Sequence, residues 1–121
     1  MKIENNLIAP TNYWIYKASK IFNNTNHCGV RGITNNIVSD KLLGLNISRA
    51  CHIHDYMYSL GKNKKEADFI FLRNMKLLIN KKTKSKILKS LREAKAYFYY
   101  LAVKIFGGFF FESSLKTTKE T

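Results

Sequence analysis

The sequence predicts an all-α domain, and three observations support this class. The chain of 121 residues has a single proline, few stretches that alternate between apolar and polar residues, and several segments with apolar residues at helical spacing. Its hydrophobic content of 45% is ordinary for a folded protein, and its length suits one hydrophobic core. We therefore expect a single domain over residues 1–121, with no internal repeat.

In the first part of the chain we expect one helix and then loops. A helix over residues 12–22, with Thr11 or Asn12 as its N-cap, would carry much aromatic surface. Residues 23–32 are rich in Asn, Thr and Gly, a composition typical of loops. Residues 33–45 show no regular period and are also expected to form a loop.

Two helices are expected next, joined by a short turn. The first begins near Ile47, with Asn46 as a plausible cap, and ends at Gly61. The second covers about residues 64–79, where apolar residues recur at helical spacing, and a lysine-rich connection follows it.

A last helix is predicted over about residues 85–106. Its apolar residues are spaced alternately four and three apart, which predicts an amphipathic stripe made of Ile87, Leu91, Ala94, Phe98, Leu101 and Ile105. Gly107 and Gly108 are expected to end this helix. Residues 112–121 are polar and are expected to form a mobile tail.

The most informative residues lie on the two middle helices. Neighbours on an α-helix point about 100° apart, so His54 and Asp55 cannot share a face. If His54 faces inward to do chemistry, Asp55 points elsewhere, and a metal ion is a sensible target. Tyr58 lies one turn beyond His54 on the same face. An antiparallel helix pair would bring Asp68 back toward both.

This pattern resembles the secreted phospholipase A2 superfamily. That family carries Cys-x-x-His-Asp-x-Cys-Tyr on one long helix, Cys-Asp-x-x-Phe on an antiparallel helix, and a Cys-Gly-x-Gly-Gly calcium loop upstream. The matching segments here are Cys51-x-x-His54-Asp55-x-x-Tyr58, Asp68-x-x-Phe71 and Cys28-Gly29-Val30-Arg31-Gly32. The three segments agree in type and order, and they place the core motif at about residues 26–80.

The resemblance implies a role for each catalytic residue. His54 would be the general base, because histidine can take up a proton near neutral pH. Asp68 would hydrogen-bond the distal ring nitrogen of His54 and fix its tautomer. Tyr58 would donate its hydroxyl to Asp68. The backbone N–H of Gly29 would help to stabilise the oxyanion.

The resemblance also implies a Ca²⁺ site and a disulfide. Calcium prefers oxygen ligands, here Asp55 and the backbone carbonyls of His27, Gly29 and Arg31. Arg31 stands where the family usually has glycine, so a degenerate homologue remains an alternative. The only two cysteines, Cys28 and Cys51, occupy places that the family bonds to each other. From composition alone, two buried free thiols would be the expectation in a reducing cell.

The expected activity is therefore calcium-dependent hydrolysis of the sn-2 ester of glycerophospholipids, which releases a fatty acid and a lysophospholipid. Lys and Arg number 21 against 8 acids, a net charge of +13 that attracts an anionic membrane surface. The alternative is a non-catalytic basic helical module that binds anionic membranes or nucleic acid, although no specific nucleic-acid motif is recognisable. No obligate protein partner is implied.

The family and the disulfide imply a secreted or extracellular protein. The first residues lack an apolar run of signal-peptide type, so we expect either that a leader is missing from this chain, or that export is unconventional, or that the protein is released by lysis. No stretch of the sequence is typical of a transmembrane helix.

Overall fold

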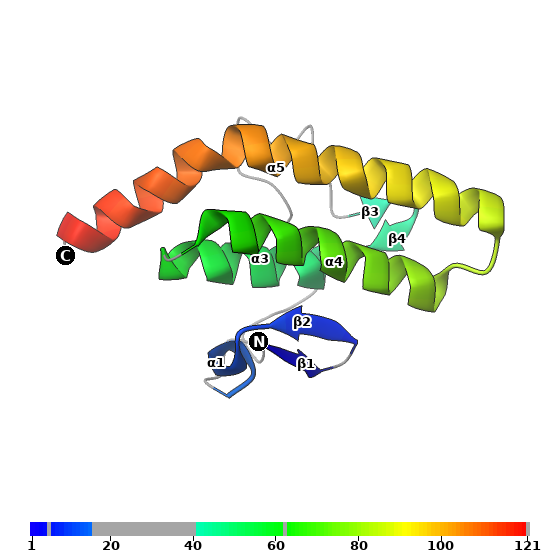
Figure 1. Ribbon diagram of the computed structural model, residues 1–121, viewed down its shortest axis with the longest axis horizontal. Coiled ribbons are helices and arrows are strands. Elements are labelled where there is room, and N and C mark those ends of the chain that lie inside the picture. Colours follow the sequence, from blue (N-terminus) through cyan, green and yellow to red (C-terminus); the bar gives the residue numbers. More distant parts are fainter. Residues whose placement is uncertain (5, 16–40, 62, 121) are drawn as a thin grey trace.

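The computed structural model describes residues 1–4, 6–15, 41–61 and 63–120, with side chains through residue 105. Its elements, in chain order, are β1 (Lys2–Glu4), β2 (Leu7–Ala9), α1 (Thr11–Ile15), β3 (Lys41–Leu42), β4 (Leu45–Asn46), α3 (Ser48–Leu60), α4 (Lys64–Lys82) and α5 (Lys86–Glu120). These residues are mostly helical, as predicted, and the strands form two short hairpins. Figure 1 shows α5 on one side of α3 and α4, and the β1–β2 hairpin on the other.

The two middle helices, α3 and α4, run antiparallel (Figure 1). Gly61 ends α3 in the left-handed conformation, with φ of 65°, and its N–H donates to the carbonyl of Tyr58 at 3.0 Å. The side chain of Asn63 then caps α4 by accepting the N–H of Glu66 at 3.0 Å. The predicted helix end at Gly61 is confirmed, and the second helix runs three residues further than expected.

A two-stranded hairpin, β3–β4, precedes α3 where a loop was expected. Its central residues, Leu43 and Gly44, both have positive φ, at 46° and 88°, as two-residue hairpin turns of type I′ require. Arg92 of α5 donates to the carbonyl of Leu43 at 3.0 Å and so holds this turn against the long helix. Asn46 accepts the N–H of Ser48 at 2.8 Å, although Ile47 occupies the cap position itself.

The N-terminal residues form a hairpin that the sequence did not predict. The buried strand β2 packs on α4, where the side chain of Asn74 accepts the N–H of Ile8 at 2.6 Å and donates to its carbonyl at 2.8 Å. Ile8 lies opposite Ile3 in β1, so Asn74 takes the place of a third strand on the other edge of β2. Because Asn74 is fully buried, these bonds satisfy polar groups that water cannot reach.

The predicted first helix is described only in part. Thr11 is the first helical residue of α1 rather than its cap, and residues 16–22 of the expected helix lie outside the described residues. The expected loops at residues 23–40 also lie outside them.

The long helix α5 differs from the prediction at its end. Its backbone continues through Gly107 and Gly108 to Glu120, so the expected stop there is wrong. Glycine costs about 1 kcal/mol relative to alanine inside a helix, which weakens a helix without ending it. The mobility predicted for residues 112–121 stays a prediction.

The face of α5 that packs on the core is not the predicted apolar stripe. The buried residues of the described part are Ala96, Tyr99, Ala102 and Val103. The predicted stripe points outward instead, with Ile87 76% exposed and Phe98 56% exposed. One contact helps to explain why the face with Tyr99 is the buried one: the hydroxyl of Tyr99 donates to the carbonyl of Lys41 in β3 at 3.1 Å.

We predict that Asn74→Leu destabilises the protein by about 2–4 kcal/mol, because the N–H and carbonyl of Ile8 would stay buried without partners. Urea unfolding followed by circular dichroism measures this loss. Asn80→Leu, at an exposed position on the same helix, is the matched control and should change stability by less than about 0.5 kcal/mol. Equal stabilities for the two variants would contradict the role given to Asn74.

Candidate active site

The antiparallel pair α3 and α4 brings the three predicted catalytic side chains together. His54 and Tyr58 lie one turn apart on the inner face of α3, and Asp68 lies in the second turn of α4. All three residues are buried, with exposed fractions of 6%, 8% and 2%. The face-sharing of His54 and Tyr58 and the return of Asp68 are as the sequence predicted.

Asp68 is the centre of the cluster. Its Oδ1 lies 2.8 Å from Nε2 of His54 and accepts a hydrogen bond from the Tyr58 hydroxyl at 2.5 Å. The imidazole ring also packs against aromatic rings, with centroid distances of 4.2 Å to Tyr58 and 4.8 Å to Phe71. These contacts fix both the position and the tilt of the imidazole ring.

The sequence interpretation missed a fourth member of this cluster, Lys64. Its ammonium lies 2.6 Å from Oδ2 of Asp68 and also donates to the carbonyls of Val103 and Lys104 in α5, at 3.3 and 3.2 Å. Lys64 and Asp68 are four residues apart on one helix, a spacing that places two side chains side by side and that could have revealed the pair. Lys64 therefore links the cluster to α5.

The charge state of Asp68 follows from these contacts. Burial alone would raise the pKa of Asp68, but hydrogen bonds from His54, Lys64 and Tyr58 outweigh burial and hold the pKa below its usual range. Burial and the carboxylate of Asp68 raise the pKa of Tyr58, so its hydroxyl stays protonated and remains a donor. The cluster thus contains an ionised carboxylate at neutral pH.

An ionised Asp68 determines the tautomer of His54. Its Oδ1 can only accept, so Nε2 of His54 carries the proton and Nδ1 keeps a lone pair in the neutral ring. Within the described residues, Nδ1 of His54 makes no hydrogen bond, since the contact with Asp68 uses Nε2. Among these residues, Nδ1 therefore keeps an unbonded lone pair, which a general base requires.

Asp55 lies on a different face of α3 from His54, as the spacing predicted. Its side chain reaches solvent, yet the surrounding protein displaces enough water to raise the pKa to about 6, an effect that neighbouring His54 opposes. No lysine or arginine of the described part of the chain forms an ion pair with it. A solvent-exposed carboxylate in such surroundings fits one ligand of a hard cation such as calcium.

The other predicted calcium ligands belong to a segment that the structure does not describe. His27, Gly29 and Arg31 lie outside the described residues, as does Cys28, and no cluster of three or more His, Cys, Asp or Glu that could hold a metal occurs within the described residues. A site built from one carboxylate and backbone carbonyls would not form such a cluster. Cys51 is half of a disulfide, and Cys28 is the only other cysteine in the sequence.

The second histidine of the motif has different surroundings. Nδ1 of His52 lies 2.7 Å from the hydroxyl of Tyr13 in α1, away from the Asp68 cluster. Burial and the nearby charge of Arg49 lower the pKa of His52. The contact with Tyr13 joins α3 to α1.

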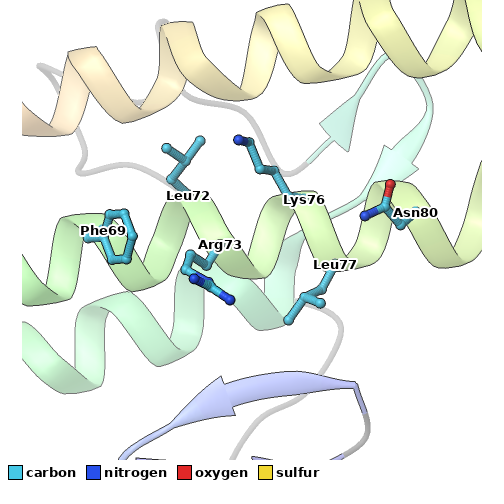
Figure 2. A pocket seen from close by; sticks show the side chains of 6 residues that line it. All are labelled: Phe69, Leu72, Arg73, Lys76, Leu77 and Asn80. Atoms are coloured by element: carbon cyan, nitrogen blue, oxygen red, sulfur yellow. The ribbon is translucent and has the colours of Figure 1, made fainter.

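A shallow groove of about 290 Å³ lies along the outer side of α4 (Figure 2). Figure 2 shows the side chains that line it, all from this helix: Phe69, Leu72, Arg73, Lys76, Leu77 and Asn80. None of the predicted catalytic residues lines this groove, so it is separate from the Asp68 cluster. Arg73 covers Phe69, with 5.8 Å from the guanidinium carbon to the ring centre.

No family model, curated protein or solved structure matches this chain.

We predict that the Asp68 cluster makes stability depend on pH in acid. The pKa of Asp68 is lower in the folded than in the unfolded state, so the stabilisation is complete above the ordinary carboxyl range and is lost as pH falls below about 4. Asp68→Asn should cost about 2–3 kcal/mol at pH 7, because the partly buried ammonium of Lys64 and the donors of His54 and Tyr58 lose their anionic acceptor. The difference from the wild type should shrink between pH 5 and pH 3.

Chemical denaturation at each pH measures this difference. Glu66→Gln removes an exposed acid in the first turn of the same helix and is the control. If Asp68→Asn and Glu66→Gln follow the same pH profile, Asp68 is not held ionised in the way described.

Proposed function

We propose that this protein is a calcium-dependent phospholipase A2 that cleaves the sn-2 ester of glycerophospholipids. The observation that carries the proposal is the buried contact of 2.8 Å between Nε2 of His54 and Asp68, with Tyr58 on the same carboxylate oxygen. A base, its orienting acid and a supporting hydroxyl on two antiparallel helices are what a phospholipase A2-like fold would require. Asp55, next to the base but on another face, supports a calcium site there.

In the proposed reaction, His54 removes a proton from water at Nδ1 while the water oxygen attacks the ester carbonyl. Asp68 keeps the proton on Nε2 and stabilises the imidazolium that forms. His54 then gives the proton from Nδ1 to the departing lysophospholipid oxygen. Tyr58 and Lys64 hold Asp68 ionised and in place throughout, so they position the base without touching the substrate.

Calcium bound by Asp55 and the carbonyls of His27, Gly29 and Arg31 would supply the positive charge that holds the substrate phosphate and the developing oxyanion. The backbone N–H of Gly29 would assist at the same oxygen. The charge of +13 supports a surface of anionic phospholipid as the place of action. Release of the protein outside the cell would give access to such substrates.

The second candidate is a basic helical module that binds anionic membranes or nucleic acid without catalysis, or a degenerate phospholipase homologue. The net charge supports binding as well as it supports an interfacial enzyme. A binding module gives no reason for a histidine whose Nδ1 bonds none of the described residues while its Nε2 meets a buried, ionised acid. We therefore favour the enzyme, and turnover separates the two candidates.

We predict that His54→Gln lowers fatty-acid release from phosphatidylglycerol vesicles by at least about 100-fold, because the general base is lost. Far-ultraviolet circular dichroism should show an unchanged helix content. His52→Gln is the matched control, since His52 lies two residues away and bonds Tyr13 instead. Vesicle binding without any turnover by the wild-type protein would favour the second candidate, and equal turnover by His54→Gln would exclude the mechanism.

We also predict that Asp55→Asn raises the calcium concentration for half-maximal hydrolysis at least about tenfold, because it removes the charged ligand. Isothermal titration with calcium gives the same comparison without turnover. Glu66→Gln, another exposed acid, should leave both values unchanged. Full activity of the wild type in excess chelator would show that calcium takes no part.

A further inference from the structure

The outer face of α5 carries a row of large apolar side chains in contact with solvent. Its members are Ile87, Leu91, Phe98 and Ile105, with exposed fractions of 76%, 54%, 56% and 70%. Ala94 is also exposed, Leu101 is partly exposed, and Tyr97 at the edge of the row is 52% exposed. We call the row from Ile87 to Ile105 the outer stripe.

The outer stripe is continuous rather than scattered. Its residues are spaced four and three apart, so at about 100° per residue they stay within a narrow sector of the helix surface. The stripe spans about 27 Å at a rise of about 1.5 Å per residue. Single exposed apolar residues are common on protein surfaces, but a contiguous row of this length marks an interaction surface.

This surface is not needed to hold α5 on the domain. The core-facing side of the helix is a separate apolar face that includes Ala96, Tyr99 and Val103. Figure 1 shows α5 as an outer layer, with α3 and α4 on one side of it only. The helix therefore has two apolar faces, and none of the elements in the described part of the chain covers the outer stripe.

The charges on α5 indicate what kind of partner fits. On a helix of about 100° per residue, Lys86 and Lys104 fall on one side of the outer stripe and Lys95 on the other. Lysine stems can cover apolar surface while the ammonium group reaches an anionic headgroup. A second copy would bring together two such basic surfaces on chains that each carry +13, which opposes self-association. The surface that complements the outer stripe and its lysines is therefore one that is both anionic and apolar.

We propose that α5 is the membrane-docking element, and that its outer stripe lies in the interface of an anionic phospholipid bilayer with the lysines at headgroup level. The proposal rests on the proposed function only in its choice of phospholipid as the partner; docking needs no catalysis. The helix lies on the membrane and does not cross it. Among the described residues, no helix combines the length and apolarity of a bilayer span.

The test uses the full chain with His54→Gln, in chelator, so that lipid is not consumed. Leu91→Ser with Phe98→Ser should lower binding to phosphatidylglycerol vesicles at least about tenfold in co-sedimentation, and wild-type binding should weaken with salt. Ile3→Ser with Ile15→Ser replaces two apolar residues of similar exposure, 65% and 61%, outside α5 and is the matched control. Unchanged binding of the α5 variant, or an equal loss in the control, overturns the proposal.

Two further measurements distinguish a membrane from a second copy of the chain, and docking from catalysis. The first measurement is light scattering at several protein concentrations. If the protein dimerises and Leu91→Ser with Phe98→Ser abolishes the dimer, a second copy covers the outer stripe, and this overturns the proposal. The second measurement uses protein with the wild-type His54. There, Leu91→Ser with Phe98→Ser should not change the hydrolysis of a short-chain phosphatidylglycerol below its critical micelle concentration. If that hydrolysis is absent in the wild type, the proposed function fails while the binding result stands.

Discussion

The arrangement of the helices depends on one buried carboxylate, Asp68. Asp68 accepts hydrogen bonds from His54 and Tyr58 on α3 and forms an ion pair with Lys64 on α4. Lys64 in turn donates to two backbone carbonyls of α5. A buried charge is costly to remove from water, and the cost is offset only when its oxygens are bonded. Both oxygens of Asp68 are bonded, so Asp68 and Lys64 together join three helices and orient an imidazole.

Other polar contacts fix the smaller elements around this centre. The Asn74 side chain pairs with both backbone groups of Ile8, and Arg92 holds the turn carbonyl of Leu43. Each uses a helix side chain to satisfy backbone groups of a short hairpin that could not be stable alone. The hairpins in turn cover apolar surface of α4 and α5, so the helical layer and the hairpins stabilise each other.

Local signals explain which parts could be predicted from the sequence. Helical spacing and Gly61 gave the limits of α3, and the one-turn spacing of His54 and Tyr58 gave their shared face. The position of the β1–β2 hairpin on α4 was missed because it depends on the contact of Ile8 with Asn74, 66 residues further along the chain. The outward position of the outer stripe was missed for a similar reason. Periodicity shows that a helix has an apolar face, but contacts from other elements decide which of two faces is buried.

A purely structural interpretation of the Asp68 cluster explains less than the catalytic one. Lys64 alone would neutralise Asp68, so an imidazole on the other oxygen is not required for charge balance. A structural cluster would also not require its histidine to keep Nδ1 without a partner among the described residues. Nor does it explain why Asp55, one of 8 acids in a chain with 21 basic residues, follows the histidine directly and pairs with none of those described. A base and an adjacent cation ligand account for all three features together.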